Sequence, residues 1–304
     1  MASALPENTK RAYRAAWKAW VSWAEAHGVQ SLPADPKMLA LYVTDAAQSG
    51  LKVSTLTLRL AAIRAAHLAA DLPNPTENPA VRQTMRAVRR TRTTLPEKKA
   101  PIRLAELKVI VNALPQSLTG VRDRALLLLG WAGALRRSEV VGVNVEHLRS
   151  EPSGDLKLYI PKSKTDQEGA GHLLGIPKAK DPDVCPVTAL KVWCEVSGVH
   201  TGPLFRPVDR HGNVGEHRLS ADAVGDIVKH ATGRVDLGRD LFAGHSLRSG
   251  FATEAGAQGI EERLIARQTR HTNLEVLRGY IRDGNVLSEQ NAARLAFAGA
   301  KPQG

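Results

Sequence analysis

The sequence predicts a mainly α-helical protein with a small β-sheet, built from an all-helical N-terminal domain, residues 1–93, and an α+β domain, residues 94–304. Three observations support this prediction. Helix-capping residues punctuate the first ninety residues, a basic stretch follows them, and one pair of β-favouring segments interrupts the helical patterns of the rest. With 304 residues, 43% of them apolar, the chain is long enough to bury two cores.

Helix starts in the N-terminal domain are predicted at three capping residues, of which the first and third precede a proline: Asp35, Ser54 and Asn78. An apolar stripe also repeats at helical spacing before Gly28. It predicts a buried helix face, and the alternative is a surface on which nucleic-acid bases stack. Its members are Tyr13, Trp17, Trp20 and Ala24.

The second domain opens with helical patterns over residues 103–113 and 120–131. The β-favouring segments 156–162 and 172–177 then flank a polar, glycine-containing stretch, which predicts a hairpin. Helical patterns resume after it and continue to the C-terminal part of the chain. They start near Pro186, Ser220, Ser246, Ile260 and Thr272.

The formal net charge of +12 favours a polyanionic partner, DNA or RNA in preference to an anionic membrane. The longest apolar run, residues 125–135, is too short to cross a bilayer and is predicted to be a buried helix. From Arg82 to Lys99 seven cations accompany one acid, which predicts a basic linker that follows DNA phosphates in preference to a solvated helix face. The N-terminus has no export-signal pattern, so a cytoplasmic location is expected.

Metal and nucleotide cofactors are not expected. Cys185 and Cys194 are too few and too widely spaced for a zinc site and are predicted to be core thiols. The sequence also contains no glycine-rich phosphate loop and no acidic cluster typical of a two-metal nuclease.

Metal-free transfer of a phosphodiester requires cations for the growing charge, a nucleophile and an acid for the leaving oxygen. Arg136 directly follows the apolar run, and Glu139, three residues later on the same helical face, could orient a neighbouring cation or histidine. His245 and Arg248 share one face near a predicted helix start. The alternative for both motifs is a solvated helix end with an incidental ion pair or an exposed arginine.

Lysines of the predicted hairpin loop, Lys162 and Lys164, could protonate a leaving oxygen, although exposed loop lysines commonly have no specific role. Thr272 and Glu275 form a capping-box pattern that predicts a helix starting just after His271. The mouth of that helix favours anions. Tyr280, farther along the same helix, is either a packing ring or a nucleophile activated by nearby cations.

The order of these groups along the chain resembles the signature of the tyrosine recombinases, or phage integrase family. The set comprises Arg136, Glu139, Lys164, His245, Arg248, His271 and Tyr280. Residues 50–90 are also similar to the helical, SAM-like core-binding domain of that family. The resemblance therefore implies a core-binding domain followed by an α+β catalytic domain of the tyrosine recombinase type.

The resemblance implies that Tyr280 attacks a DNA phosphodiester, forming a 3′-phosphotyrosyl link and a free 5′ hydroxyl without a cofactor. Arg136 and Arg248 would clamp the phosphate, with Glu139 in support, and His245 and His271 would donate to or exchange protons with the transition state. Lys164 would protonate the leaving oxygen. It is preferred to Lys162 because the family's catalytic lysine lies at the loop tip.

The resemblance further implies a homotetramer on two DNA duplexes carrying inverted-repeat sites, a Holliday-junction pathway, and a C-terminal helix, residues 287–298, passed to a neighbouring protomer. The alternative for that helix is packing within its own domain. Two features depart from the family pattern: Thr269 and Arg270 stand where Leu-Gly commonly precedes His271, and Arg137 is an extra arginine. The alternatives in function are a non-catalytic DNA-binding regulator and a relaxing enzyme like the type IB topoisomerases.

Overall fold

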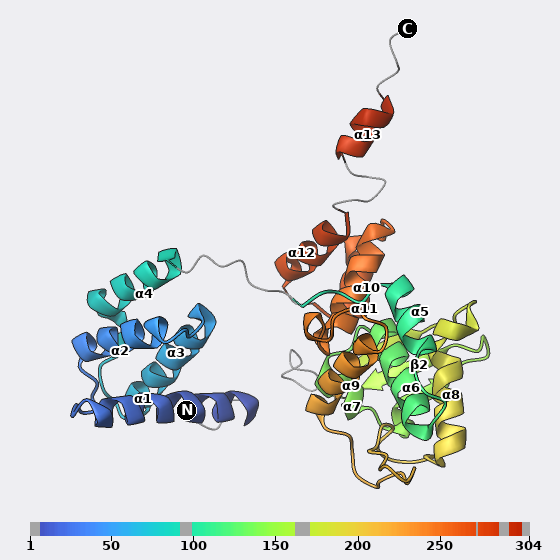
Figure 1. Ribbon diagram of the computed structural model, residues 1–304, viewed down its shortest axis with the longest axis horizontal. Helices are drawn as coiled ribbons and strands as arrows, with labels where there is room; N and C mark the ends of the chain where they lie inside the picture. Colours follow the sequence, from blue (N-terminus) through green and yellow to red (C-terminus); the bar gives the residue numbers. More distant parts are fainter. Residues whose placement is uncertain (1–6, 92–98, 162–170, 272, 286–291, 300–304) are drawn as a thin grey trace. The chain divides into compact units, whose positions relative to one another are not determined.

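The computed structural model describes residues 7–91, 99–161, 171–271, 273–285 and 292–299. Within these ranges the protein is mainly helical, with one three-stranded antiparallel sheet (Figure 1), which confirms the predicted fold class. The chain divides into two compact units, residues 1–97 and 98–304. The expected domain boundary, between residues 93 and 94, lies outside the described residues.

The helices of the N-terminal unit begin where capping residues allow. Asp35 accepts a hydrogen bond from the backbone N of Lys37 at 2.6 Å, and Asn78 accepts one from the backbone N of Ala80 at 3.0 Å. The start predicted at Ser54 is wrong, because the backbone is already helical from Val53 and Ser54 lies inside the first turn. The α-helices of this unit are α1 (Glu7–Ala26), α2 (Pro36–Gln48), α3 (Val53–Ala69) and α4 (Pro79–Thr91).

The aromatic stripe of α1 belongs to the core of the N-terminal unit. Trp20 and Ala24 are fully buried, and Trp17 and Tyr13 are partly buried. The indole N–H of Trp20 donates to the carbonyl of Ser31 at 3.0 Å, so its polar atom is also satisfied inside the fold. The stripe is therefore a packing face that holds α1 against α3, and not a base-stacking surface.

The sheet of the second unit contains the predicted hairpin. Strands β1 (Leu148–Ser150), β2 (Leu156–Ile160) and β3 (His172–Ile176) lie in that order. In β2, buried and exposed residues alternate, as expected for a strand with one face on the core. The hairpin loop, residues 162–170, lies outside the described residues.

Helices of this unit share a core with the buried face of the sheet and carry the site described below. The apolar run predicted to be a buried helix forms the second half of α6 as far as Ala132, and residues 125–129 are at most 1% exposed. Residues 133–135, the end of the run, lie in the turn that follows. In Figure 1, α10 and α12 lie side by side, and α6 packs against both α8 and α10. The α-helices of this unit are α5 (Leu104–Asn112), α6 (Leu118–Ala132), α7 (Arg137–Gly142), α8 (Pro186–Ser197), α9 (Ala221–Gly233), α10 (His245–Ala257), α11 (Glu262–Thr269), α12 (Leu274–Asn285) and α13 (Ala292–Gly299).

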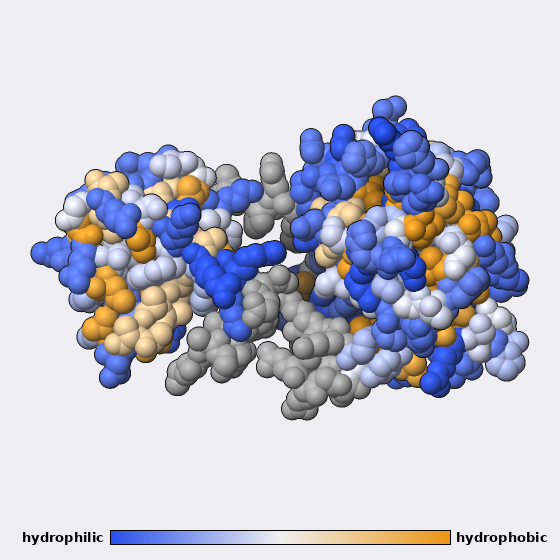
Figure 2. All heavy atoms as spheres, turned by 90° about the horizontal axis from the view of Figure 1, so that it is seen from below, coloured by the Kyte–Doolittle hydropathy of each residue, from blue (hydrophilic) through white to orange (hydrophobic). Residues whose placement is uncertain are grey.

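Figure 2 shows one face of the protein, on which hydrophilic residues predominate over the second unit and apolar residues form patches on both units, including a broad one on the N-terminal unit. Among the described helices, none combines the length and the apolar character that a bilayer span requires.

Candidate active site

The turn between α6 and α7 supplies carbonyl oxygens to the site. Gly133 ends α6, Ala134 adopts φ +44°, and the backbone N of Leu135 donates back to Gly130 at 2.9 Å. Carbonyls at a helix C-terminus have no partner within the helix and need donors from elsewhere. At this turn the donors are the guanidinium groups of Arg248 and Arg270.

Arg136 is the N-cap residue of α7 and is held by Glu139. The carboxylate of Glu139 accepts from the backbone N of Arg136 at 2.9 Å and from its Nη1 at 2.7 Å. Glu139 is 5% exposed, so the alternative of a solvated helix end is wrong. Burial raises the pKa of Glu139, but the charges of Arg270 and Arg136 and their hydrogen bonds outweigh burial and lower it overall.

Arg248 lies on α10, which begins at His245, one residue before the predicted start near Ser246. Its side chain is buried, the residue being 1% exposed, and its Nη1 donates to the carbonyl of Ala134 at 2.7 Å. Its Nη2 is buried without a hydrogen-bond partner among the described residues. Burial, aided by the charges of Arg136 and Arg270, lowers the pKa of Arg248 to about 9. This cation therefore has an unused donor, although the charge of Glu139 acts on it in the opposite sense to burial.

Tyr280 lies on α12 and meets His245 of α10. The phenol oxygen is 2.8 Å from Nε2 of His245, across 35 residues of sequence. Burial lowers the pKa of His245, and the nearby charges of Arg248 and Arg136 lower it further, which favours the neutral imidazole. The helix begins at Leu274, and Asn273 caps it by accepting from the backbone N of Glu275 at 2.9 Å. Thr272, the predicted cap, lies outside the described residues.

His271 is fixed by Thr269. The hydroxyl of Thr269 donates to the carbonyl of Ile265 at 2.8 Å and therefore accepts from Nδ1 of His271, which lies 2.7 Å away. In the neutral ring Nδ1 therefore carries the hydrogen, and Nε2 carries the lone pair. The ring centroid of His271 is 6.1 Å from that of Tyr280. Burial, together with the charges of Arg248 and Arg136, lowers the pKa of His271 to about 4.

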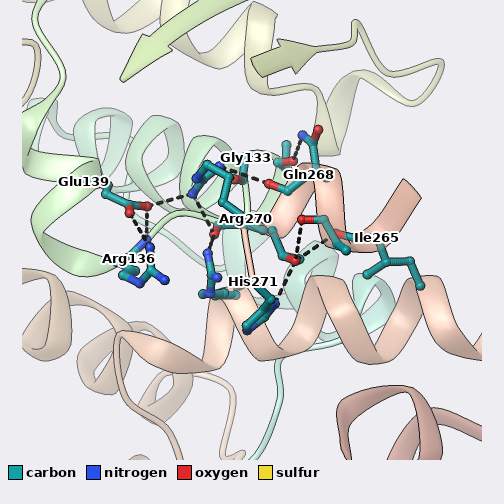
Figure 3. A network of polar contacts seen from close by, with 12 residues as sticks. Gly133, Arg136, Glu139, Ile265, Gln268, Arg270 and His271 are labelled. Carbon is teal, nitrogen blue, oxygen red and sulfur yellow. Dashed lines mark hydrogen bonds and ion pairs between the residues drawn. The ribbon is translucent and has the colours of Figure 1, made fainter. Parts of the chain in front are cut away.

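Arg270 is a site residue that the sequence prediction missed. Its backbone has φ +55° at the C-cap of α11, a left-handed conformation that glycine adopts readily and that an arginine adopts only at a cost in backbone strain. Figure 3 shows its guanidinium between Glu139 and the α6–α7 turn. Its Nη2 donates to Oε2 of Glu139 at 2.7 Å and its Nη1 to the carbonyl of Gly133 at 3.2 Å. The feature of the sequence that could have identified Arg270 as a site residue is its position as a cation directly before His271.

The other predicted residues are distributed as follows. Six of the seven candidate side chains belong to the connected cluster described above, and Lys164 lies outside the described residues. Arg137 points to α9, with its Nη1 3.3 Å from Oδ1 of Asp222. Cys185 is buried and Cys194 partly buried. Among the described residues no three His, Cys, Asp or Glu side chains are placed to hold a metal ion.

Known proteins match the chain along most of its length. The phage integrase family matches residues 101–285, and the phage integrase N-terminal SAM-like domain matches residues 2–70. The integrase/recombinase xerD homolog of Selenomonas ruminantium is 38% identical over 293 residues, which cover 95% of this chain and 85% of that protein. Recombinase cre of Escherichia phage P1 is 26% identical over 308 residues, covering 95% and 87%.

A similar fold is found in the XerH site-specific recombinase bound to a palindromic difH substrate. That structure has a TM-score of 0.60 and 17% identity and covers 87% of this chain and 71% of the other. At this identity the comparison shows the fold alone. The family match over residues 101–285 and the 38% identity show that the chain belongs to the phage integrase family of tyrosine recombinases, site-specific recombinases that act on DNA.

Proposed function

We propose that this recombinase cleaves and religates DNA at a specific site, with Tyr280 as the nucleophile. The observation that carries the proposal is the 2.8 Å contact between the Tyr280 hydroxyl and Nε2 of His245, in a cluster with the buried Arg248. A phenol has an ordinary pKa of about 10 and is a weak nucleophile unless a base or cations activate it. This cluster offers both: His245 as the base, and Arg136 and Arg248 as the cations.

The cleavage step begins when the phenol oxygen of Tyr280 attacks the phosphorus and its proton passes to Nε2 of His245. The bond from phosphorus to the 5′ oxygen breaks, and Lys164 supplies the proton that this oxygen takes up. The products are a 3′-phosphotyrosyl bond and a 5′ hydroxyl. Attack by the 5′ hydroxyl of a partner strand reverses the chemistry, restores a phosphodiester and releases Tyr280. Exchange of one strand pair in this way gives a Holliday junction.

The cations of the cluster suit the charge that grows on the phosphate oxygens during this step. Nη2 of Arg248 has an unused donor, and Arg136 is oriented by Glu139, so the two guanidinium groups can bind the non-bridging oxygens. A phosphate at this position adds negative charge beside His271. Its pKa then rises, and the ring can donate a hydrogen bond through Nε2.

The assembly that we propose is a homotetramer on two duplexes, each with an inverted-repeat site. Support comes from the XerH complex, in which a related fold is bound to a palindromic substrate. The C-terminal helix α13 is the element proposed to dock on a neighbouring protomer. Its Phe297 is 80% exposed, as expected of an apolar side chain that is buried only on assembly.

The test compares wild type with Tyr280→Phe on end-labelled DNA from around the protein's own gene, including any inverted repeats. Wild type should give a band that is retarded under denaturing conditions and that protease collapses, and Tyr280→Phe should lack it. Tyr13→Phe is the matched control and should retain it, because Tyr13 belongs to the N-terminal unit.

Two results would refute the proposal and favour the alternatives. Native gel shifts without any covalent band, on DNA that carries the bound site, would indicate a DNA-binding protein without cleavage activity. Relaxation of plasmids of any sequence, with equal adduct formation on all of them, would indicate an enzyme of the type IB topoisomerase kind.

A further inference from the structure

The ion pair between Arg270 and Glu139 is the most deeply buried ion pair among the described residues. The two side chains are 4% and 2% exposed, compared with 8% and 15% for Arg122 and Asp123. Burying two charges costs free energy of desolvation that their attraction often fails to recover. A contribution to stability is therefore a weak explanation for this pair, and its effect on the neighbouring groups is the more informative question.

The carboxylate oxygens of Glu139 are divided between two arginines. Oε1 accepts from Nη1 of Arg136 at 2.7 Å, and Oε2 accepts from Nη2 of Arg270 at 2.7 Å. A carboxylate without a second partner can accept two parallel bonds from one guanidinium. Oε2 also accepts from the backbone N of Arg136 at 2.9 Å. With Arg270 and this backbone N as donors to Oε2, Glu139 binds the guanidinium of Arg136 through Oε1 alone. Arg136, whose side chain is 22% exposed, keeps donors for another anion.

The charge of the cluster leads to the same conclusion. Three guanidinium groups, those of Arg136, Arg248 and Arg270, surround the single carboxylate of Glu139, which leaves a net charge of +2. Without the Arg270 charge the net value is +1, and the remaining carboxylate is opposed mainly by Arg136. A phosphodiester anion binds more weakly to such a site, because charge acts strongly where water is excluded.

Arg270 also connects the segments that carry the site. Its Nη1 donates to the carbonyls of Gly133, in the α6–α7 turn, and of Gln268, at 3.2 and 3.0 Å. His271 is the next residue, so the position of its ring depends on this connection (Figure 3). We propose that Arg270 is a positioning residue of the anion site: by binding Glu139 it leaves Arg136 available for the scissile phosphate and fixes the backbone that presents His271. This role rests on the function proposed above.

The first experiment measures the binding of inorganic phosphate without cleavage. Phosphate is titrated into the full chain, and the histidine ring signals are followed by NMR, with the His271 signal identified from a His271→Gln variant. Arg270→Gln should weaken phosphate binding roughly 10- to 100-fold, the usual cost of losing a residue that orients a binding group. The double variant Arg270→Gln/Glu139→Gln removes the opposing charge as well and should recover the part of the loss that comes from charge, and so bind phosphate more tightly than Arg270→Gln.

The matched control is Arg263→Gln, which breaks an Arg–Glu pair on the same helix. That pair is exposed, at 78% and 62%, and its loss should leave phosphate binding unchanged. Wild-type affinity in Arg270→Gln would overturn the proposal, as would a double variant as weak as Arg270→Gln alone. If Arg270→Gln fails to fold, Glu139→Gln is compared with the double variant. The double variant should bind phosphate less than about tenfold more weakly, because only the net charge falls and no carboxylate is left without its counter-charge, and a loss of tenfold or more would refute the counter-charge role.

The second experiment measures the rate of covalent adduct formation and DNA affinity separately. Arg270→Gln should slow adduct formation roughly 10- to 100-fold and raise the Kd for DNA by a much smaller factor, because most DNA contacts lie elsewhere, and the double variant should recover part of the rate. A merely structural role would lower the rate and the DNA affinity alike, and removing a second charge would recover neither. If wild type forms no adduct, the proposed function fails, while the phosphate titration still decides the role of Arg270.

Discussion

Gly250, in the middle of α10, allows another part of the chain to cross the helix that carries His245 and Arg248. At the crossing, the backbone N of Ile102 donates to the carbonyl of Ser246 at 3.0 Å, and the indole N–H of Trp131 donates to the carbonyl of Ile102 at 2.9 Å. A Cβ at position 250 would lie 1.9 Å from that carbonyl oxygen. Real Cβ atoms essentially never approach within 3.0 Å, so Gly250→Ala requires one backbone to move by more than 1 Å.

The expected loss of stability follows from these contacts. Overpacking costs about 1–3 kcal/mol, and each of the two hydrogen bonds at the crossing contributes about 1 kcal/mol. Replacing a helical glycine by alanine stabilises the helix by about 0.5–1 kcal/mol, which offsets part of this loss. The free energy of unfolding should therefore fall by about 2–4 kcal/mol. For a domain of this size, that corresponds to a fall in Tm of roughly 5–15 °C.

Calorimetry of the full chain measures this effect, with the N-terminal unit as an internal reference. The matched control is Gly279→Ala in α12, where the new Cβ would meet no atom within 4 Å. This variant should gain about 0.5–1 kcal/mol from helix propensity. A Gly250→Ala protein that unfolds at or above the wild-type temperature would refute the packing argument, as would equal shifts in the two variants.

Two further predictions concern histidines. His67 is fully buried, its Nδ1 lies 2.8 Å from the carbonyl of Ile63, and its Nε2 accepts from the backbone N of Ala34 at 2.8 Å. His67→Ala should therefore cost about 2–4 kcal/mol, measured by urea unfolding through the tryptophan fluorescence of α1, and an unchanged midpoint would contradict this. The folded-state pKa of His271, about 4, lies below its ordinary value of 6.5, so the folded protein binds fewer protons than the unfolded chain. The contribution of the neutral His271 ring to the free energy of unfolding is therefore fully present above pH 6.5. It is lost as the pH falls toward 4, by up to roughly 3 kcal/mol. His271→Gln should flatten the curve of stability against pH in this window.

Local patterns in the sequence predicted the elements that depend on neighbouring residues. The hairpin and a helix starting near Ser246 were correct, and the buried helix predicted over residues 125–135 was correct as far as Ala132, because apolar periodicity and turn composition act within one element. Residues 133–135 form a turn instead, because Ala134 adopts φ +44°. The start at Ser54 was wrong because capping residues also occur inside a first turn. The order of the seven candidate residues identified the family before any contact between them was known.

By itself, then, the sequence determined the fold class, the family and a list of candidate groups. The tertiary structure decided which of those groups meet. His245 and Tyr280 are 35 positions apart, and Arg270 and Glu139 are 131 apart, so no helical or strand period relates them. Their contacts depend on how α6, α10, α11 and α12 pack, which is a property of the whole core. The roles of Gly250 and Arg270 depend on tertiary contacts for the same reason. Gly250 matters because the backbone at Ile102 crosses α10 beside it, and Arg270 matters because it binds the carboxylate of Glu139.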